Sequence, residues 1–170
     1  MTNVDNYFKN SMDLFGFKQV VCIIFTMKKI LIFLILVFVG IQVIPMNVPA
    51  DLPVKEGDAL EAPENVQAIL ERSCFDCHSS HTVFPWYSSI APVSWFTKYH
   101  VKEAREHMNF STWNSYKDEK KLKYLEKIPK AIKSKMPMDS YLIMHKNAKL
   151  SDADKKVLTE WTTEAAFDLE

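Results

Sequence analysis

The run Cys74-Phe75-Asp76-Cys77-His78 constrains this chain more than any other feature, because it places two thiols and an imidazole at the C-x-x-C-H spacing. On one turn of helix the two thiols lie on the same side, and each can form a thioether with one vinyl group of a haem. The histidine directly after the second cysteine then lies beneath the iron as its proximal ligand. The spacing therefore predicts a single, covalently attached haem c held by Cys74, Cys77 and His78.

Two other uses of this motif remain open, although the pattern favours them less. A structural zinc site needs four ligands, and the one other cysteine, Cys22, lies in a distant apolar stretch. Zinc would have to recruit scattered histidines, namely His81, His100, His107 and His145. A thioredoxin-like dithiol should follow a strand in a βαβ unit, and no such alternation surrounds Cys74.

The N-terminal part of the chain predicts a membrane-targeting helix. Residues 30–44 are apolar apart from Gly40 and Gln42, and Lys28-Lys29 precede them. A basic flank before an apolar core is typical of a signal peptide or signal anchor, which we place at residues 27–46. The lysines predict a cytoplasmic N-terminus and a domain in the periplasm, anchored to the inner membrane by one pass. Covalent haem attachment takes place on that same side of the membrane.

Two points about this region stay open. The stretch Val48-Pro49-Ala50 resembles a cleavage signal, but its proline makes an uncleaved anchor the favoured interpretation. Residues 1–26 are interpreted as a cytoplasmic extension that contains a second, shorter apolar run. Joining the two runs would bury two lysines at about 2.5–3.5 kcal/mol each, so one run alone should span. A start of translation at Met27 would explain the extension, and mass spectrometry of the native N-terminus tests it.

The remaining residues predict a linker and one helical domain. Residues 47–63 contain three prolines and scattered acidic residues without apolar periodicity, which is typical of a tether. Within residues 64–170 there is no glycine for primed hairpin turns and no alternating strand pattern. We therefore predict an all-α domain built around the haem.

Apolar spacing and capping residues predict the principal helices of this domain. One runs from Glu64 into the haem motif, a second covers residues 92–108, and a third covers residues 118–135, where Pro129 should bend or interrupt it. A last helix should begin at Ser151, whose side chain suits an N-cap.

Met136 is the best candidate for a second, distal iron ligand. Its sulfur is a soft ligand that raises the reduction potential, and Pro137 fixes the backbone beside it on a loop between two predicted helices. The alternatives are Met138, His100 and His145. A methionine that only fills a gap in the core is also a common finding.

Two further groups of residues have a functional and a structural interpretation. Trp86 and Trp95 follow the haem motif and can wall the haem, or they can pack in an ordinary core. Residues 117–135 contain eight lysines. A lysine collar near a haem edge steers acidic redox partners, but a merely solvated helix face is the more common case.

The order of these motifs resembles the bacterial haem-binding domain family, whose members are cytochrome c-like and often membrane-anchored. The resemblance covers residues 66–161. It is carried by residues 73–79, by Pro85-Trp86-Tyr87-Ser88 and by Ile90-Ala91-Pro92-Val93-Ser94-Trp95. Later positions also match, namely Asn109-Phe110-Ser111, Trp113, Met136-Pro137, Tyr141, His145, Ala148, Leu150-Ser151 and Trp161. One position departs, because the family commonly has asparagine at Ser80. The resemblance implies haem c binding through Cys74, Cys77 and His78.

These observations together predict an electron carrier rather than an enzyme, since no acid–base pair or substrate pocket is indicated. The expected function is single-electron transfer by a membrane-anchored periplasmic monohaem domain, loaded by the c-type cytochrome maturation machinery. Its redox partners are not identifiable from the sequence, and a formal net charge of zero gives no indication of nucleic acid. One alternative is a haem-based sensor with an open sixth position. Another is a zinc-stabilised extracytoplasmic interaction domain.

Overall fold

The structure, a computed structural model, describes the backbone of residues 2–169 and the side chains of residues 19–169. The chain divides into two compact units, one ending at Pro45 and one beginning at Met46. Regular structure in the described residues is helical, and β pairing is limited to one isolated bridge between Asp51 and His81. The predicted all-α class is confirmed.

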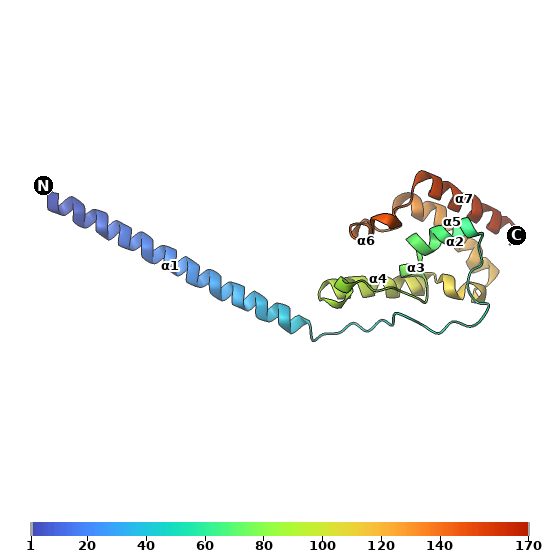
Figure 1. Cartoon of the computed structure of the whole chain (residues 1–170), viewed down its shortest axis with the longest axis horizontal. Helices are drawn as coiled ribbons and strands as arrows, with labels where there is room; N and C mark the ends of the chain where they lie inside the picture. The colour runs from blue at the N-terminus through green and yellow to red at the C-terminus, as the bar shows by residue number, and fades with distance from the viewer. Residues whose placement is uncertain (1, 170) are drawn as a thin grey trace. The chain divides into compact units, whose positions relative to one another are not determined.

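The first unit is dominated by one helix, α1 (Thr2–Ile41) (Figure 1). Its stretch from Gln19 to Ile41 is long and apolar enough to cross a membrane by length and composition, and a signal sequence has the same properties. The helix ends at Ile41, ahead of the predicted boundary at residue 46, and a turn follows in which the Ile44 N–H donates to the Ile41 carbonyl at 3.3 Å. It also continues through Lys28-Lys29, since lysine is a good helix former.

The second unit contains the helices that form the candidate site. Its longer helices are α2 (Glu64–Ser73), α4 (Val93–His107), α5 (Asp118–Ser134) and α7 (Asp152–Phe167). Short helices connect them: α3 (Phe75–His78), η1 (Trp86–Ser89), η2 (Phe110–Ser115), α6 (Asp139–Leu142) and η3 (Lys146–Ala148). In Figure 1, α5 and α7 lie side by side, in agreement with the many contacts between them.

The helix boundaries follow local sequence signals closely. Pro92 precedes the first residue of α4, where its fixed backbone angle suits a helix start. The helix α5 continues across Pro129, so this proline does not interrupt it. Ser151 caps α7, as predicted, and it forms a reciprocal capping box with Asp154. The same aspartate accepts a 2.9 Å hydrogen bond from Arg72, which ties α2 to the start of α7.

The core of the second unit is built from the apolar faces of α2, α5 and α7 together with η2. Its buried members are Val66, Ile69, Leu70, Met108, Phe110, Trp113, Tyr124, Leu125, Ile128, Ile132, Leu150 and Leu158. Phe75, the residue that follows the first motif cysteine, packs against this cluster and lies 5.6 Å from the Phe110 ring. The core therefore anchors the helix that carries the haem motif.

Residues 47–63 lack regular structure, as a linker should, but they are attached to the domain. The buried guanidinium of Arg105 donates to the carbonyls of Pro49 and Ala50 at 2.6 and 2.7 Å. It also donates to the Ser79 carbonyl at 2.8 Å, directly after the haem motif. These bonds extend the folded unit back beyond Glu64, where the sequence placed its start.

A turn at Gly57 fastens the same segment farther along. Gly57 has a φ of 81°, a left-handed conformation that glycine adopts without steric cost, and the Asp58 N–H closes the turn on the Lys55 carbonyl at 3.1 Å. The Asp58 carbonyl then accepts a 2.8 Å bond from the Asn114 N–H, and its carboxylate accepts a 2.7 Å bond from the Ser115 hydroxyl. Both partners lie in η2, so the segment follows the surface of the domain.

Candidate haem site

The C-x-x-C-H residues form one turn at the junction of α2 and α3. Cys74 lies between α2 and α3, and α3 carries Cys77 and His78. The Cys77 and His78 N–H groups both donate to the Cys74 carbonyl, at 3.2 and 2.9 Å. The predicted single helical turn is therefore present.

The imidazole of His78 is held in the state that an iron ligand requires. Its Nδ1 lies 3.0 Å from the Met108 carbonyl, which can only accept, so Nδ1 carries the proton and Nε2 keeps a free lone pair. Burial lowers the pKa of His78, an effect that the hydrogen bond to Met108 partly opposes. Metal-binding histidines are typically oriented by such a bond through their second nitrogen.

The two motif thiols are neutral in the folded chain. Burial raises the pKa of Cys74 to about 12, with a further contribution from Cys77. Burial also raises the pKa of Cys77 to about 11, helped by the neighbouring Asp76 carboxylate. A catalytic dithiol would need a lowered pKa, so these values argue against the thioredoxin-like alternative.

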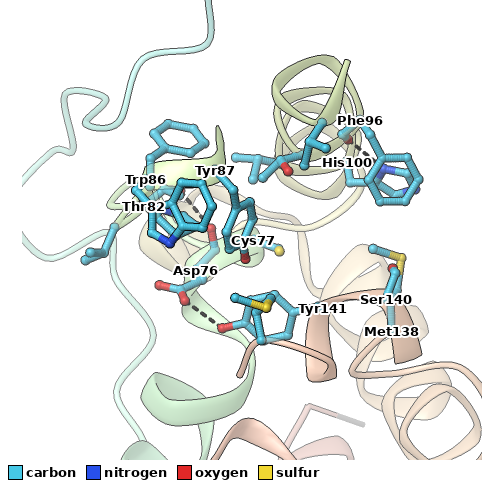
Figure 2. A pocket seen from close by; sticks show the side chains of 17 residues that line it. Asp76, Cys77, Thr82, Trp86, Tyr87, Phe96, His100, Met138, Ser140 and Tyr141 are labelled. Carbon is cyan, nitrogen blue, oxygen red and sulfur yellow. Dashed lines mark hydrogen bonds between the residues drawn. The ribbon is translucent and has the colours of Figure 1, made fainter. Parts of the chain in front are cut away.

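Two adjoining cavities meet at the motif. The first, about 320 Å³, is lined by Ser73, Cys74, Asp76, Cys77, His78, His100, Glu103, Ala104, His107, Met136, Pro137, Met138 and Tyr141. The second, about 310 Å³, is lined by Asp76, Cys77, His100, Met138 and Tyr141 again, together with apolar and aromatic residues from residues 82–101 and Met144. Figure 2 shows the Cys77 sulfur pointing into the space bounded by His100, Ser140 and Tyr141. The shared residues make this one continuous, mainly apolar site.

The donors in this site fit a haem. An apolar cavity walled by two thiols, a neutral imidazole and thioether sulfurs offers both a covalent attachment and the soft or borderline ligands that haem iron uses. Met136 and Met138 both line the cavity that contains His78, and Met136 is 40% exposed. The structure therefore brings both methionine candidates to the site.

The two histidine candidates differ in position. His100 lines both cavities, and its Nδ1–H donates to the Phe96 carbonyl at 2.8 Å, which leaves Nε2 available. His145 lines neither cavity. Its Nδ1 lies 3.2 Å from the Tyr141 carbonyl and 3.4 Å from the Tyr87 hydroxyl.

The two tryptophan candidates also separate. Trp86 is 71% exposed and lines the second cavity, where Figure 2 shows it beside Tyr87. Trp95 lies on α4 and lines neither cavity. Of the two tryptophans, only Trp86 therefore lies at the site, as the haem-wall interpretation requires.

A hydrogen bond that sequence reasoning missed links the motif to α6. The Tyr141 hydroxyl donates to the Asp76 carboxylate at 2.6 Å (Figure 2). Burial raises the pKa of Tyr141, and the hydrogen bond to Asp76 raises it further, so the phenol stays a donor at neutral pH. Tyr141 also stacks on His145 at 4.1 Å. The family resemblance included both residues, but nothing in their spacing indicated Asp76 as the partner.

We expect Tyr141→Phe to destabilise the holoprotein by about 1–2 kcal/mol, because it leaves a half-buried carboxylate without its donor. Chemical denaturation measures this loss. The exposed Tyr99 provides the control, and Tyr99→Phe should change the free energy of unfolding by less than about 0.5 kcal/mol. Equal effects of both substitutions would contradict the role of the Asp76 bond.

The loop after the motif is fixed by buried polar side chains. The Ser80 hydroxyl accepts a 3.0 Å bond from the Asn109 amide, and the Ser80 N–H donates to the Ser111 hydroxyl at 2.9 Å. Ser80 is the position that departs from the family pattern. Its hydroxyl takes part in the attachment of this loop to η2, and it does not line either cavity.

A metal site of the zinc type receives no support from the geometry. In the part of the chain whose side chains are described, no group of three or more histidine, cysteine or acidic side chains is arranged to hold a metal ion. Two of the histidines that zinc would have to recruit, His81 and His145, lie outside the cavity that contains the motif. His81 pairs with Asp51 at 2.8 Å on the surface.

The apolar cavity that His78 lines, together with Cys74 and Cys77, fits a haem-binding protein. The family model described as "Haem-binding domain" matches residues 36–164. The chain therefore belongs to the haem-binding domain family, and it binds haem. Searches of curated proteins and of solved structures found no match.

Proposed function

We propose that this protein is a membrane-anchored monohaem c-type cytochrome domain that carries single electrons in the periplasm. The observation that carries the proposal is the fixed, neutral imidazole of His78 in a cavity that also contains both motif thiols and Met136. This set of side chains matches a six-coordinate haem with histidine and methionine ligands.

Bound haem supplies a one-electron couple, and the protein supplies a rigid apolar surrounding. The Met108 carbonyl orients His78, and the Asp76–Tyr141 bond connects the motif to the segment that follows Met136. Because these contacts are already formed, little rearrangement should accompany electron transfer. No side chain is required to move a proton in this function.

The raised pKa values of the thiols bear on how haem is attached. Thiols that stay protonated in the folded chain are poor nucleophiles, so thioether formation should precede folding. This order suits loading by the c-type maturation machinery in the periplasm. The apolar part of α1 would deliver the domain to that compartment and keep it at the inner membrane.

One observation favours a second candidate function. Met136 is 40% exposed on a loop, and Met138 lines the same cavity, so the sixth position need not be permanently filled. A haem with an open or weakly held sixth position would bind a small gas and act as a sensor. This candidate predicts rapid carbon monoxide binding by the ferrous protein.

The full chain, made in a host with c-type maturation machinery, tests both candidates. For an electron carrier we expect haem staining on a denaturing gel, a reversible one-electron potentiometric titration and slow carbon monoxide binding. Rapid carbon monoxide binding would favour the sensor. Correctly exported protein without covalent haem would refute the c-type proposal.

A further inference from the structure

A third depression, about 220 Å³, adjoins the Met136 loop and is ringed by basic side chains. It is lined by Ile132, Lys133, Ser134, Lys135, Met136, Pro137, Asp139, Leu142, Lys149, Leu150 and Lys155. The lysines come from the end of α5, from the loop after η3 and from α7, so only the folded chain brings them together. We name Lys133, Lys135, Lys149 and Lys155 the basic rim.

The charge of the basic rim is largely uncompensated. No ion pair of the described residues involves Lys133, Lys135 or Lys149, and Lys155 lies 3.6 Å from Asp152. Asp139 is the carboxylate among the lining residues. Because the whole chain has a formal net charge of zero, this accumulation is local.

We propose that the basic rim is the docking surface for an acidic protein that exchanges electrons with the haem. The inference rests on the proposed electron-carrier function and names the partner's chemistry. Met136 and Pro137 line both this depression and the cavity that contains His78. An acidic surface bound here therefore contacts the loop that lines the haem site. One electron then passes from the ferrous iron to the partner's oxidised centre, and no proton is transferred.

A protein partner explains this surface better than a lipid surface does. Peripheral membrane binding combines basic residues with exposed aromatic and apolar side chains. No aromatic residue is among those that line this depression, and Met136 is its one exposed large apolar side chain. Complementary charge instead guides protein encounter and sets the association rate.

The test compares two triple charge reversals. Lys133→Glu/Lys135→Glu/Lys149→Glu removes the basic rim, and Lys117→Glu/Lys123→Glu/Lys127→Glu makes the same charge change toward the start of α5. The control lysine nearest to the rim, Lys127, lies about 9 Å along α5 from Lys133 at 1.5 Å per residue. The control lysines are exposed and outside all ion pairs of the described residues.

Binding of a labelled oligoglutamate peptide, measured by fluorescence anisotropy, needs no haem chemistry and so reports on the surface alone. At low salt we expect the rim variant to weaken this binding about tenfold and the control variant less than about threefold. Oxidation of the ferrous protein by hexacyanoferrate(III), which gains the one electron, should slow by a similar factor. Oxidation by the cation tris(phenanthroline)cobalt(III) should become faster.

Equal effects of the two triple variants would overturn the proposal, because net charge alone would then explain them. The proposal would also be overturned, in favour of a lipid surface, if the wild type bound phosphatidylglycerol vesicles but not oligoglutamate. In that case the rim variant would lose the vesicle binding. The haem stain and the midpoint potential report separately on the electron-carrier function, so failure of that function is recognised independently.

Discussion

The variant Cys74→Ala/Cys77→Ala is expected to carry no haem through a denaturing gel. These two thiols are the sulfurs that line the cavity with His78 and can form thioethers. Without them any haem is held by axial ligands and apolar contacts alone, which denaturation removes. Haem staining, normalised to an immunoblot of the exported chain, measures the loss, which we expect to exceed about 95%.

Cys22 provides the matched control for this experiment. It lies in α1, outside the haem-site unit, so Cys22→Ala should keep the full stain. Each single variant at Cys74 or Cys77 retains one possible thioether and should give an intermediate signal. Covalent haem in the double variant would refute attachment through this motif.

Met136→Ala is expected to produce the second largest effect, on the iron rather than on the covalent bond. Loss of a thioether ligand should remove the methionine–iron charge-transfer band and leave a high-spin or water-ligated haem. The midpoint potential should fall by on the order of 0.1–0.2 V, within the roughly 0.8 V range that axial ligands control. Visible spectroscopy and potentiometric titration measure both changes.

Met138→Ala is the control, because Met138 lines the same cavity from two positions farther along the chain. It should leave the charge-transfer band in place. The reverse pattern, with loss only in the Met138 variant, would assign the sixth ligand to Met138. An unchanged spectrum in both variants would favour the open site, or His100, whose Nε2 is available.

Local patterns in the sequence were sufficient for the class of fold and for the motif. Helical spacing, Pro92 and the Ser151 cap act over a few residues, so both bounds of α4 and the start of α7 were predictable within about two residues. The C-x-x-C-H turn is equally local, since its hydrogen bonds join neighbours in the chain. Whether the helix would continue across Pro129 was less predictable, because the packing against α7 that accompanies the continuous α5 is a tertiary contact.

The contacts that complete the site were decided by the tertiary structure. The Met108 carbonyl that orients His78 and the Tyr141 hydroxyl on Asp76 come from distant positions, and no periodicity marks them as partners. Residues 47–63 were predicted to be a tether because they contain three prolines and no apolar periodicity, yet Arg105 binds two of their carbonyls. Every residue has a backbone carbonyl, so the sequence does not mark the ones that are bound. The lysines of residues 117–135 likewise suggested one basic helix face.

In the folded chain those lysines instead form two separate groups, and two lysines from outside residues 117–135 join one of the groups. Lys133 and Lys135 join Lys149 and Lys155 beside Met136, whereas the earlier lysines of α5 lie along the rest of that helix. The sequence by itself therefore determined the haem motif and the helical class, because both depend on neighbours in the chain. The tertiary structure alone decided the orientation of His78, the attachment of the linker and the place of the basic rim. All three depend on groups that meet only when the helices pack.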